Sequence, residues 1–266
     1  MENNKKYRLV ITLNALNHLG INLYSNVPAV LSEVVANAWD ADAEKVKISI
    51  DRNLNEIRIK DTGIGMNLDD INEKYLKVGY RKRDNGETKT PILNRPVMGR
   101  KGIGKLSLFS IAETIEVYSK KGSSLNAFRM NTKDIQNQIS SDSNTKAYYP
   151  EEISTEPINF DKGTLLILKG ITKRLYQNQT EGALKKRLSR RFSIIGEKYK
   201  FRVFINGEEI KIEDRDYFHK IEYLWYYGDE SYKEFAKNAI EIRKRDNLLK
   251  PYLKYQKPNS CKIEGE

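Results

Sequence analysis

Apolar residues recur at two different periods between residues 28 and 60, and each period predicts a different element. Over residues 28–40 they recur at helical spacing, and Pro28 is favoured in a first helical turn, so we expect a helix there. Residues 46–50 and 56–60 instead alternate apolar and polar side chains on either side of a turn-like segment. That alternation predicts a β-hairpin with one buried face.

The rest of the chain mixes strand-like and helix-like segments. Further strands are predicted in apolar segments at residues 114–119, 126–130, 164–168, 201–205 and 210–212. The last two flank Asn206-Gly207, a strong hairpin signal, and residues 183–195 are typical of a basic amphipathic helix. A polar, loop-rich stretch follows residue 130 and runs through residues 139–157. These elements predict an α/β (α+β) two-layer sandwich, with a mixed β-sheet and helices over one face.

The predicted helix carries polar residues at helical spacing. Glu33, Asn37 and Asp40 fall at i, i+4 and i+7, so their side chains are expected on one stripe, opposite the apolar residues. A carboxylate beside a carboxamide suits metal-assisted hydrolysis, because the amide oxygen is a ligand that Mg²⁺ accepts and the carboxylate can deprotonate a water. An ordinary solvated helix face fits the same pattern equally well.

The predicted hairpin ends in the motif Asp61-x-Gly63-x-Gly65. The two glycines would let the backbone turn sharply and leave space for a flat ring above it. A carboxylate at that strand end could accept a hydrogen bond from an exocyclic amine. Asp-Thr-Gly is also common in tight turns, and the motif alone favours that simpler interpretation.

Residues 99–107 form a glycine-rich segment that contains Lys105. Backbone N–H groups of such a segment can approach phosphate oxygens while the lysine neutralises charge. The P-loop pattern is satisfied up to Lys105, but Leu106 stands where a P-loop needs Ser or Thr, and the two prolines of residues 90–98 suit a buried strand poorly. We therefore expect a short helix from Leu106 to Ala112, with its N-terminus directed at phosphates.

In this order the three motifs resemble the N, G1 and G2 boxes of the GHKL ATPases, the family of gyrase B subunits, heat-shock-ninety chaperones, histidine kinases and MutL. The sequence of residues 32–43 and 99–107 is most similar to that of the MORC-like bacterial branch. The resemblance covers about residues 11–212. It implies a Bergerat-type ATP-binding domain at residues 1–215, with ATP and Mg²⁺ as cofactors, and a C-terminal extension at 216–266 that could begin a transducer-like second domain.

The resemblance also implies a role for each matched residue. Glu33 would activate the attacking water, Asn37 would bind Mg²⁺, and Lys105 would meet the γ-phosphate as the second catalytic residue. Asp61 would bind the adenine amine, and Asp40 would have a supporting role. The other cofactor-binding residues that it implies are Ala41, Gly63, Gly65, Met66, Gly99, Gly102, Ile103, Gly104, Leu106, Ser107 and Thr164.

A basic stretch at residues 74–89 lies between the second and third boxes. In this family the equivalent stretch is a lid that orders over ATP, so residues 80–98 should be protease-sensitive without nucleotide and protected by a nonhydrolysable analogue. The cations that could screen phosphate or meet a polyanion are Arg81, Lys82, Arg83, Arg95, Arg100 and Lys101. A solvated loop kept soluble by its charge fits these residues at least as well.

Composition limits the remaining interpretations. The 266 residues can bury one good core, and no apolar stretch or signal-peptide pattern suggests a membrane span or secretion, so we expect a cytoplasmic protein. Cys261 is the only cysteine, which excludes intrachain disulfides and a cysteine-rich zinc site. The formal net charge of +11 invites a nucleic-acid interpretation through the basic surface at 173–198, although Arg and Lys on a helix more often form its solvated side.

Two classes of function remain open. The first is an ATPase, slow in isolation, that binds ATP or ADP and closes a homodimer on ATP binding, in a DNA-associated or anti-phage defence role. The second is a nucleotide-gated protein-interaction module with little hydrolysis, or a chaperone-like or histidine-kinase-like protein. The kinase form is disfavoured because no His-bearing dimerisation helix is recognised before the ATP site, and Lys105 with Arg100 and Lys101 suits the MutL-like side. The aromatic tail at 217–255 could meet a protein partner or a second domain, or form a helical cap on the core.

Overall fold

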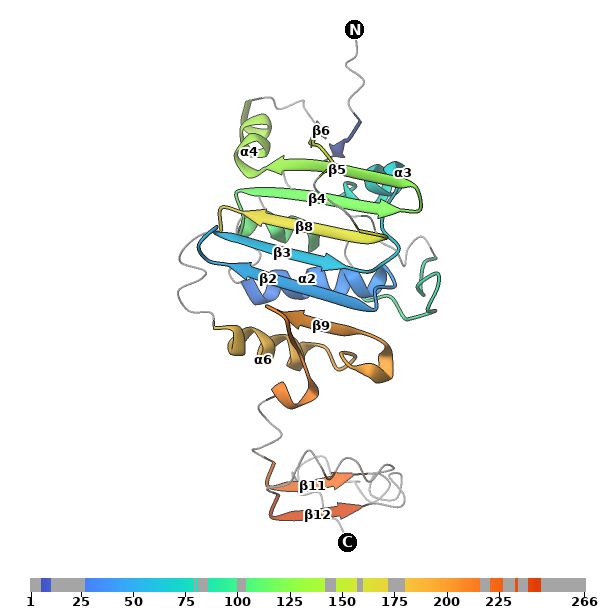
Figure 1. The fold of residues 1–266 in the computed structure, drawn as a ribbon, viewed down its shortest axis with the longest axis vertical. Coiled ribbons are helices and arrows are strands. Elements are labelled where there is room, and N and C mark those ends of the chain that lie inside the picture. Colours follow the sequence, from blue (N-terminus) through green and yellow to red (C-terminus); the bar gives the residue numbers. More distant parts are fainter. Residues whose placement is uncertain are drawn as a thin grey trace, which may run out of the picture. The chain divides into compact units, whose positions relative to one another are not determined.

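The structure is a computed structural model that describes residues 6–10, 27–78, 80, 86–99, 104–141, 147–156, 160–171, 180–215, 221–226, 233 and 239–244. The chain divides into two compact units, residues 1–212 and 213–266. The first unit has two layers, an eight-stranded sheet with helices packed over one of its faces (Figure 1). No helix within the described ranges is long and apolar enough to cross a membrane.

The large sheet is mixed. Its strands run in the order β10 (Glu208–Glu209), β9 (Arg202–Ile205), β2 (Lys45–Asp51), β3 (Glu56–Asp61), β8 (Gly163–Lys169), β4 (Thr114–Lys121), β5 (Ser124–Asn131) and β7 (Glu151–Glu152). Only β2 and β9 pair in parallel, and all the other neighbours are antiparallel. Two short strands, β1 (Leu9–Val10) and β6 (Ala147–Tyr148), form a separate antiparallel pair.

The helices of the first unit are mostly short. Within the described ranges they are α2 (Val27–Asp40), α3 (Leu68–Asp70), the π-helix η1 (Ile71–Tyr75), the 3-10 helix η3 (Gly104–Ser110), α4 (Thr132–Ser141), α6 (Glu181–Arg191) and the 3-10 turn η4 (Glu197–Tyr199); a further 3-10 turn, η5 (Ile212–Asp214), spans the boundary between the two units in the sequence. The longest of them, α2, packs against η3 and α6.

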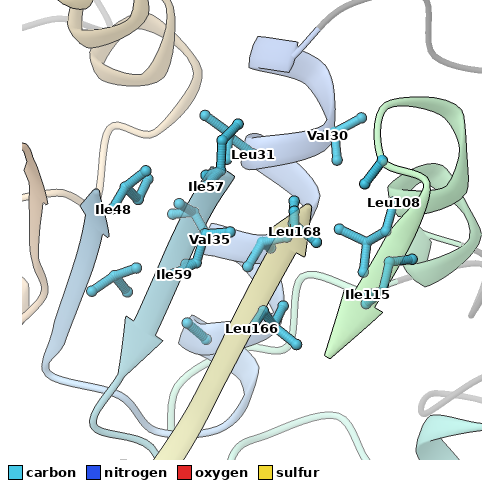
Figure 2. Close-up of a cluster of buried hydrophobic side chains, with 14 of the residues drawn as sticks. Val30, Leu31, Val35, Ile48, Ile57, Ile59, Leu108, Ile115, Leu166 and Leu168 are labelled. Atoms are coloured by element: carbon cyan, nitrogen blue, oxygen red, sulfur yellow. The ribbon is translucent and has the colours of Figure 1, made fainter. Parts of the chain in front are cut away.

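The core lies between α2 and the sheet. Val30, Leu31 and Val35 of α2 are fully buried against side chains from β2, β3, β8, β4 and η3, as Figure 2 shows. Those sheet and η3 residues are Ile48, Ile57, Ile59, Leu166, Leu168, Ile115 and Leu108. Each such side chain stabilises the fold by about 1.5–3 kcal/mol through the apolar area it removes from water. The alternation in β2 and β3 places apolar side chains against the helices and mostly charged side chains on the opposite face of the sheet.

The two-layer fold, the helix at 28–40 and the hairpin at 46–60 are confirmed. Three other expectations need correction. The helix expected at 183–195 ends at Arg191, because the chain becomes extended at Phe192 and buries Phe192 and Ile195 in the core. The last hairpin closes through Glu208–Glu209 instead of 210–212. The short helix expected at 106–112 is a 3-10 helix over Gly104–Ser110.

One helix was missed altogether. Helix α4 begins directly after β5, in the stretch expected to be a loop. The Asn131 side chain accepts hydrogen bonds from the backbone N–H groups of Lys133 (2.9 Å) and Asp134 (3.4 Å), which caps the first turn, and Ile135 is buried. A capping asparagine followed by a buried isoleucine was the available signal.

In the second unit, β11 (Tyr223–Tyr226) and β12 (Glu241–Lys244) pair in parallel. The alternative of a helical cap is therefore wrong for these residues of the aromatic tail. Tyr223 and Trp225 are exposed, whereas Tyr226 is buried. The protein partner expected for this tail stays a prediction.

Candidate nucleotide site

Asp61 is the last residue of β3, as expected, and the described residues donate hydrogen bonds to only one of its two carboxylate oxygens. Its Oδ1 accepts hydrogen bonds from the backbone N–H groups of Gly63 (2.8 Å) and Thr164 (3.2 Å). Its Oδ2 receives no hydrogen bond from any described residue. Burial raises the pKa of Asp61 to about 6, and the two N–H groups counter only part of that rise. At neutral pH the side chain is thus an ionised acceptor with one oxygen available to a ligand.

Two glycines allow the segment at residues 61–65 to approach the end of α2, β4 and the start of β8 closely. Gly65 has φ +68° and Gly163 has φ +110°, conformations that residues with a Cβ rarely adopt. A Cβ on Gly65 would overlap the carbonyl oxygen of Lys120, and a Cβ on Gly163 would overlap that of Asp61. The backbone N–H of Ile64 also donates to the carbonyl of Ala41, 2.8 Å away, at the end of α2. The first and second motifs are therefore in direct contact.

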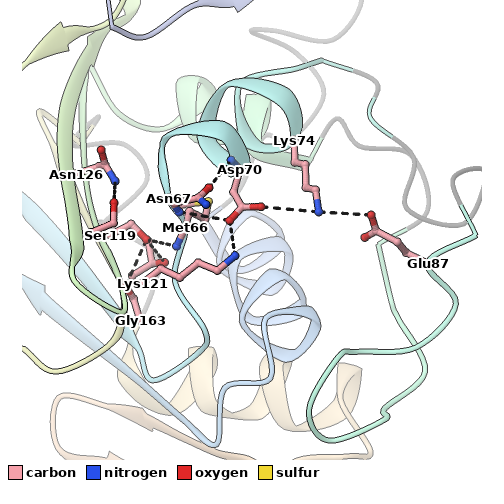
Figure 3. Close-up of polar contacts among 11 residues, drawn as sticks. Met66, Asn67, Asp70, Lys74, Glu87, Ser119, Lys121, Asn126 and Gly163 are labelled. Carbon is pink, nitrogen blue, oxygen red and sulfur yellow. Dashed lines mark hydrogen bonds and ion pairs between the residues drawn. The ribbon is translucent and has the colours of Figure 1, made fainter.

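A buried serine joins the second motif to the Gly163-Thr164 element. The Oγ of Ser119, on β4, accepts from the backbone N–H of Met66 (2.9 Å) and lies 3.1 Å from the Thr164 hydroxyl (Figure 3). It is also 3.3 Å from the carbonyl oxygen of Gly163. Sequence reasoning missed Ser119, because a serine at an inward position of an apolar strand carries no recognisable motif.

The segment after the second motif is fixed to the same strand. Asn67 and Asp70 form a reciprocal capping box at the start of α3, and Lys121 of β4 donates to Asp70 Oδ2 at 2.6 Å (Figure 3). Burial raises the pKa of Asp70, but the hydrogen bonds and charge of Lys121 and its neighbours lower it further, so the net shift is downward. Asp70 thus remains ionised and holds the segment beside β4.

Glu33 and Asn37 lie one turn apart on the outer side of α2. Asn37 is exposed, and the Glu33 side chain is 26% exposed. Among the described residues, the Glu33 carboxylate pairs only with Arg191 of α6, whose Nη2 lies 3.4 Å from Glu33 Oε1. The two residues expected to bind metal and activate water are therefore open to a ligand, with one guanidinium beside the carboxylate.

Asp40 is buried, unlike Glu33 and Asn37, with which it was expected to share a stripe of α2. It is only 5% exposed, and its carboxylate accepts from the backbone N–H groups of Met98 (2.7 Å) and Gly99 (2.9 Å). Asp42 makes a matching pair of bonds to Ile92 (2.8 Å) and Leu93 (3.2 Å). Two carboxylates at the end of α2 therefore hold the segment that leads into the third motif.

Arg95 is an internal anchor and not a candidate for phosphate screening. Its guanidinium lies 4.4 Å from the centre of the Trp39 ring and donates to the carbonyls of Ala43, Tyr199 and Lys200 at 2.6–3.1 Å. It is only 6% exposed. The expected lid therefore has a fixed base at residues 90–99, while residues 81–85 lie outside the described ranges.

The phosphate end of the site is only partly described. Ser107 is buried, and the backbone of Gly104–Ser110 forms η3. Arg100–Ile103 and the side chains of Lys105 and Leu106 lie outside the described residues, so their expected roles stay predictions. In the part of the chain that is described, no three His, Cys, Asp or Glu side chains gather as metal ligands. This donor set fits Mg²⁺, which uses one or two protein ligands and completes its shell with phosphates and water.

Comparison with known proteins assigns the fold to a family. The model for the histidine kinase-, DNA gyrase B- and HSP90-like ATPases matches residues 24–164. The chain belongs to this GHKL ATPase family. The matched region begins just before α2 and ends at Thr164, so it contains every residue proposed for the site.

Individual relatives differ in how much they share with the chain. A putative type II restriction enzyme, HgiDII of Herpetosiphon aurantiacus, is 43% identical over 238 residues, which is 90% of this chain and 38% of that protein. The chaperone protein HtpG of Sulfurovum sp. (strain NBC37-1) is 29% identical over 132 residues, 42% of this chain and 21% of its own length. HtpG of Natranaerobius thermophilus is 25% identical over 139 residues. The chain thus spans well under half the length of these relatives, and the MORC-like branch stays a prediction.

Proposed function

We propose that this GHKL domain binds ATP with Mg²⁺ and hydrolyses it, using Glu33, Asn37, Asp61 and Lys105. The observation that carries the proposal is the arrangement at Asp61. One oxygen is held by Gly63 and Thr164, and the other receives no hydrogen bond from the described residues, at the point where the first and second motifs touch.

The Asp61 carboxylate suits adenine in particular. Its Oδ2 can accept a hydrogen bond from the exocyclic amine of adenine. Guanine presents a carbonyl oxygen at that ring position, so two acceptors would face each other and a buried polar group would be left unpaired. Ser119 keeps Met66 and Thr164 in place beside the base. ATP should therefore bind in preference to GTP.

Hydrolysis would take place at the outer side of α2. Glu33 would orient and deprotonate the attacking water, and Lys105 would neutralise charge on the γ-phosphoryl group. Asn37 would hold the Mg²⁺ ion, which when bound screens the charge of the phosphates. No nucleophilic side chain is required, since water attacks the γ-phosphorus directly.

The wider role follows from the relatives and remains part of the proposal. The resemblance to MORC and MutL proteins favours a homodimer that closes on ATP binding. The relative with 43% identity is a putative type II restriction enzyme, which favours a DNA-associated defence role over a chaperone role.

Two variants test the site. Glu33→Ala should keep ATP affinity and lower phosphate release by about 10²–10⁴-fold, the usual contribution of a general base. Asp61→Asn should abolish measurable ATP binding, because an amide can turn a donor toward the adenine amine. Asp69→Asn, at an exposed aspartate of α3, is the matched control and should bind like wild type. Unchanged turnover in Glu33→Ala would overturn the assignment of the base.

A nucleotide-gated module with little hydrolysis is the second candidate, and one contact favours it. Arg191 lies beside Glu33 and competes with water for its carboxylate. A protein that relies on binding alone would take up ATP, change its oligomeric state and release no phosphate above the level of Glu33→Ala. Isothermal titration and phosphate release on the same wild-type sample separate the two candidates.

A further inference from the structure

The face of the large sheet that lies away from α2 has two different halves. Over β8, β4 and β5 it is covered, because Phe160 and Ile153 pack on Tyr118, Ala127 and Ile167. Over β9, β2 and β3 most side chains are charged, and the cations among them are at least partly exposed. We call this second half the basic face; its cations are Lys45, Lys47, Arg58, Lys60 and Arg202.

The strand register places like charges directly opposite each other on the basic face. Lys47 of β2 is the cross-strand partner of Lys60 of β3. On the other side of β2, Lys45 is the partner of Arg202 of β9. Like charges in such positions destabilise a sheet, so the stability of the fold does not explain why these cations lie together.

Internal carboxylates neutralise only part of this charge. Arg202 forms two 2.7 Å hydrogen bonds with Glu209, and Arg58 pairs with Glu56. Lys47 and Lys60 form no ion pair with any carboxylate of the described residues. The covered half behaves differently, since Arg129 and Lys169 both bind the buried Glu116 at 2.9–3.0 Å. The basic face therefore keeps cations that no described carboxylate neutralises, whereas the covered half pairs Arg129 and Lys169 with one buried carboxylate.

The spacing of the cations suits a polyanion better than one phosphate group. Neighbouring strands lie about 4.8 Å apart, and side chains two residues apart on a strand are separated by about 6.5 Å. The five cations therefore form a spread row without a common focus. Duplex nucleic acid carries one charge per roughly 1.7 Å of its axis, so such a row can meet several backbone phosphates at once.

The composition of the basic face favours nucleic acid over an acidic protein as the bound polyanion. Lysine is depleted in the core of protein interfaces, whereas Lys and Arg supply most phosphate contacts to nucleic acid. Among the described residues two rings lie beside these cations: Phe204, with Lys45 6.0 Å and Arg202 5.1 Å from its ring centre, and the buried Phe160, 4.8 Å from Lys60. Single strands are usually bound by several stacking aromatics, so a duplex fits this surface better.

The surface expected from sequence, residues 173–198, is a weaker candidate. In α6, Lys185 pairs with Glu208 and Arg191 pairs with Glu33, which neutralises part of its charge. Residues 173–179 lie outside the described residues.

We infer that the basic face binds the phosphate backbone of duplex nucleic acid, without base preference. This inference does not rest on ATP hydrolysis, because the basic face lies on the side of the sheet away from α2. Lys60 directly precedes Asp61 in β3, yet the two side chains alternate to opposite faces. A duplex and a nucleotide can therefore be bound at the same time.

The test compares the double variant Lys47→Ala/Lys60→Ala with Lys133→Ala/Lys162→Ala, which removes the same charge at two exposed lysines outside the basic face. Binding to a labelled duplex of about 20 base pairs is followed by fluorescence anisotropy without nucleotide, at roughly 50 to 200 mM salt. Losing two phosphate contacts should make the slope of log K against log salt about 1.8 less negative and weaken binding tenfold or more at low salt. The control should match wild type.

Three results would overturn the inference. They are wild-type binding that is absent or insensitive to salt, a Lys47→Ala/Lys60→Ala variant that keeps the wild-type slope, and tighter binding of polyglutamate or single-stranded DNA than of the duplex. Thermal unfolding of the double variant should occur at the wild-type temperature or higher, because a like-charge pair has been removed. ATP affinity of the same variant should be unchanged. A failure of the duplex test would therefore leave the proposed ATPase site standing, and a failure of the ATPase tests would leave the duplex-binding inference standing.

Discussion

Replacing Asp61 by asparagine should stabilise the nucleotide-free fold while it abolishes ATP binding. Burial raises the pKa of Asp61 from its ordinary value of 3.8 to about 6. The folded state therefore binds the proton more tightly than the unfolded state does. Between pH 3.8 and 6 the folded protein carries more protons, so the stability contributed by this group is full at low pH and is lost as the pH rises.

The magnitude follows from the size of the shift. The interval between 3.8 and about 6 corresponds to about 3 kcal/mol above pH 6, since one pH unit is worth about 1.4 kcal/mol. Asp61 keeps some contact with solvent, and screening reduces this figure, so we expect a cost of about 1–3 kcal/mol. Asparagine is neutral, and its Oδ1 can still accept from Gly63 and Thr164.

Urea unfolding of wild type and Asp61→Asn between pH 4 and 8, without nucleotide, measures this effect. The variant should be more stable by about 1–3 kcal/mol at pH 7, and the difference should shrink toward zero near pH 4. Asp69→Asn should show no such gain. A variant less stable than wild type at pH 7, or a difference that does not change with pH, would refute the argument that a buried charge is kept here for binding.

Three further substitutions test the supports of the site. Gly163→Ala should lower the free energy of unfolding by about 2–4 kcal/mol, measured in urea, because φ +110° is strained for alanine and the added Cβ meets the carbonyl of Asp61; a loss below about 0.5 kcal/mol would contradict the close approach. Asp40→Ala leaves two backbone N–H groups unpaired and should cost about 2–4 kcal/mol and expose residues 86–98 to protease, whereas unaltered cleavage would show that Asp40 does not hold this segment. Arg191→Ala frees Glu33 from a surface ion pair worth up to about 1 kcal/mol and should raise phosphate release two- to fivefold; a fall in turnover would mean that Arg191 assists hydrolysis.

The sequence predicted the framework of the site because short-range patterns determine it. Helical spacing over residues 28–40 and alternation over 46–60 are local signals, and they placed Asn37 on the outer side of α2 and Asp61 at the end of β3. The motif order then indicated the family, which the match over residues 24–164 shows.

What could not be predicted depends on contacts between distant segments. The stripe containing Asp40 looked solvated, yet Asp40 is buried because residues 98 and 99, nearly 60 positions away, donate to it. The sequence allowed Arg95 to screen phosphate or to lie in a solvated loop, and neither holds, because Trp39 and the carbonyls of the 199–200 turn surround its guanidinium. Ser119 has no motif at all, and its role follows only from the register of β4 with β8.

A crystal structure with Mg²⁺ and a nonhydrolysable ATP analogue tests the central claim most directly. We predict that the adenine amine lies within hydrogen-bond distance of Asp61 Oδ2, that Mg²⁺ contacts Asn37 Oδ1, and that a water near the γ-phosphate is bound by Glu33. An analogue bound elsewhere, or a guanine nucleotide bound at Asp61 as well as ATP, would contradict the account.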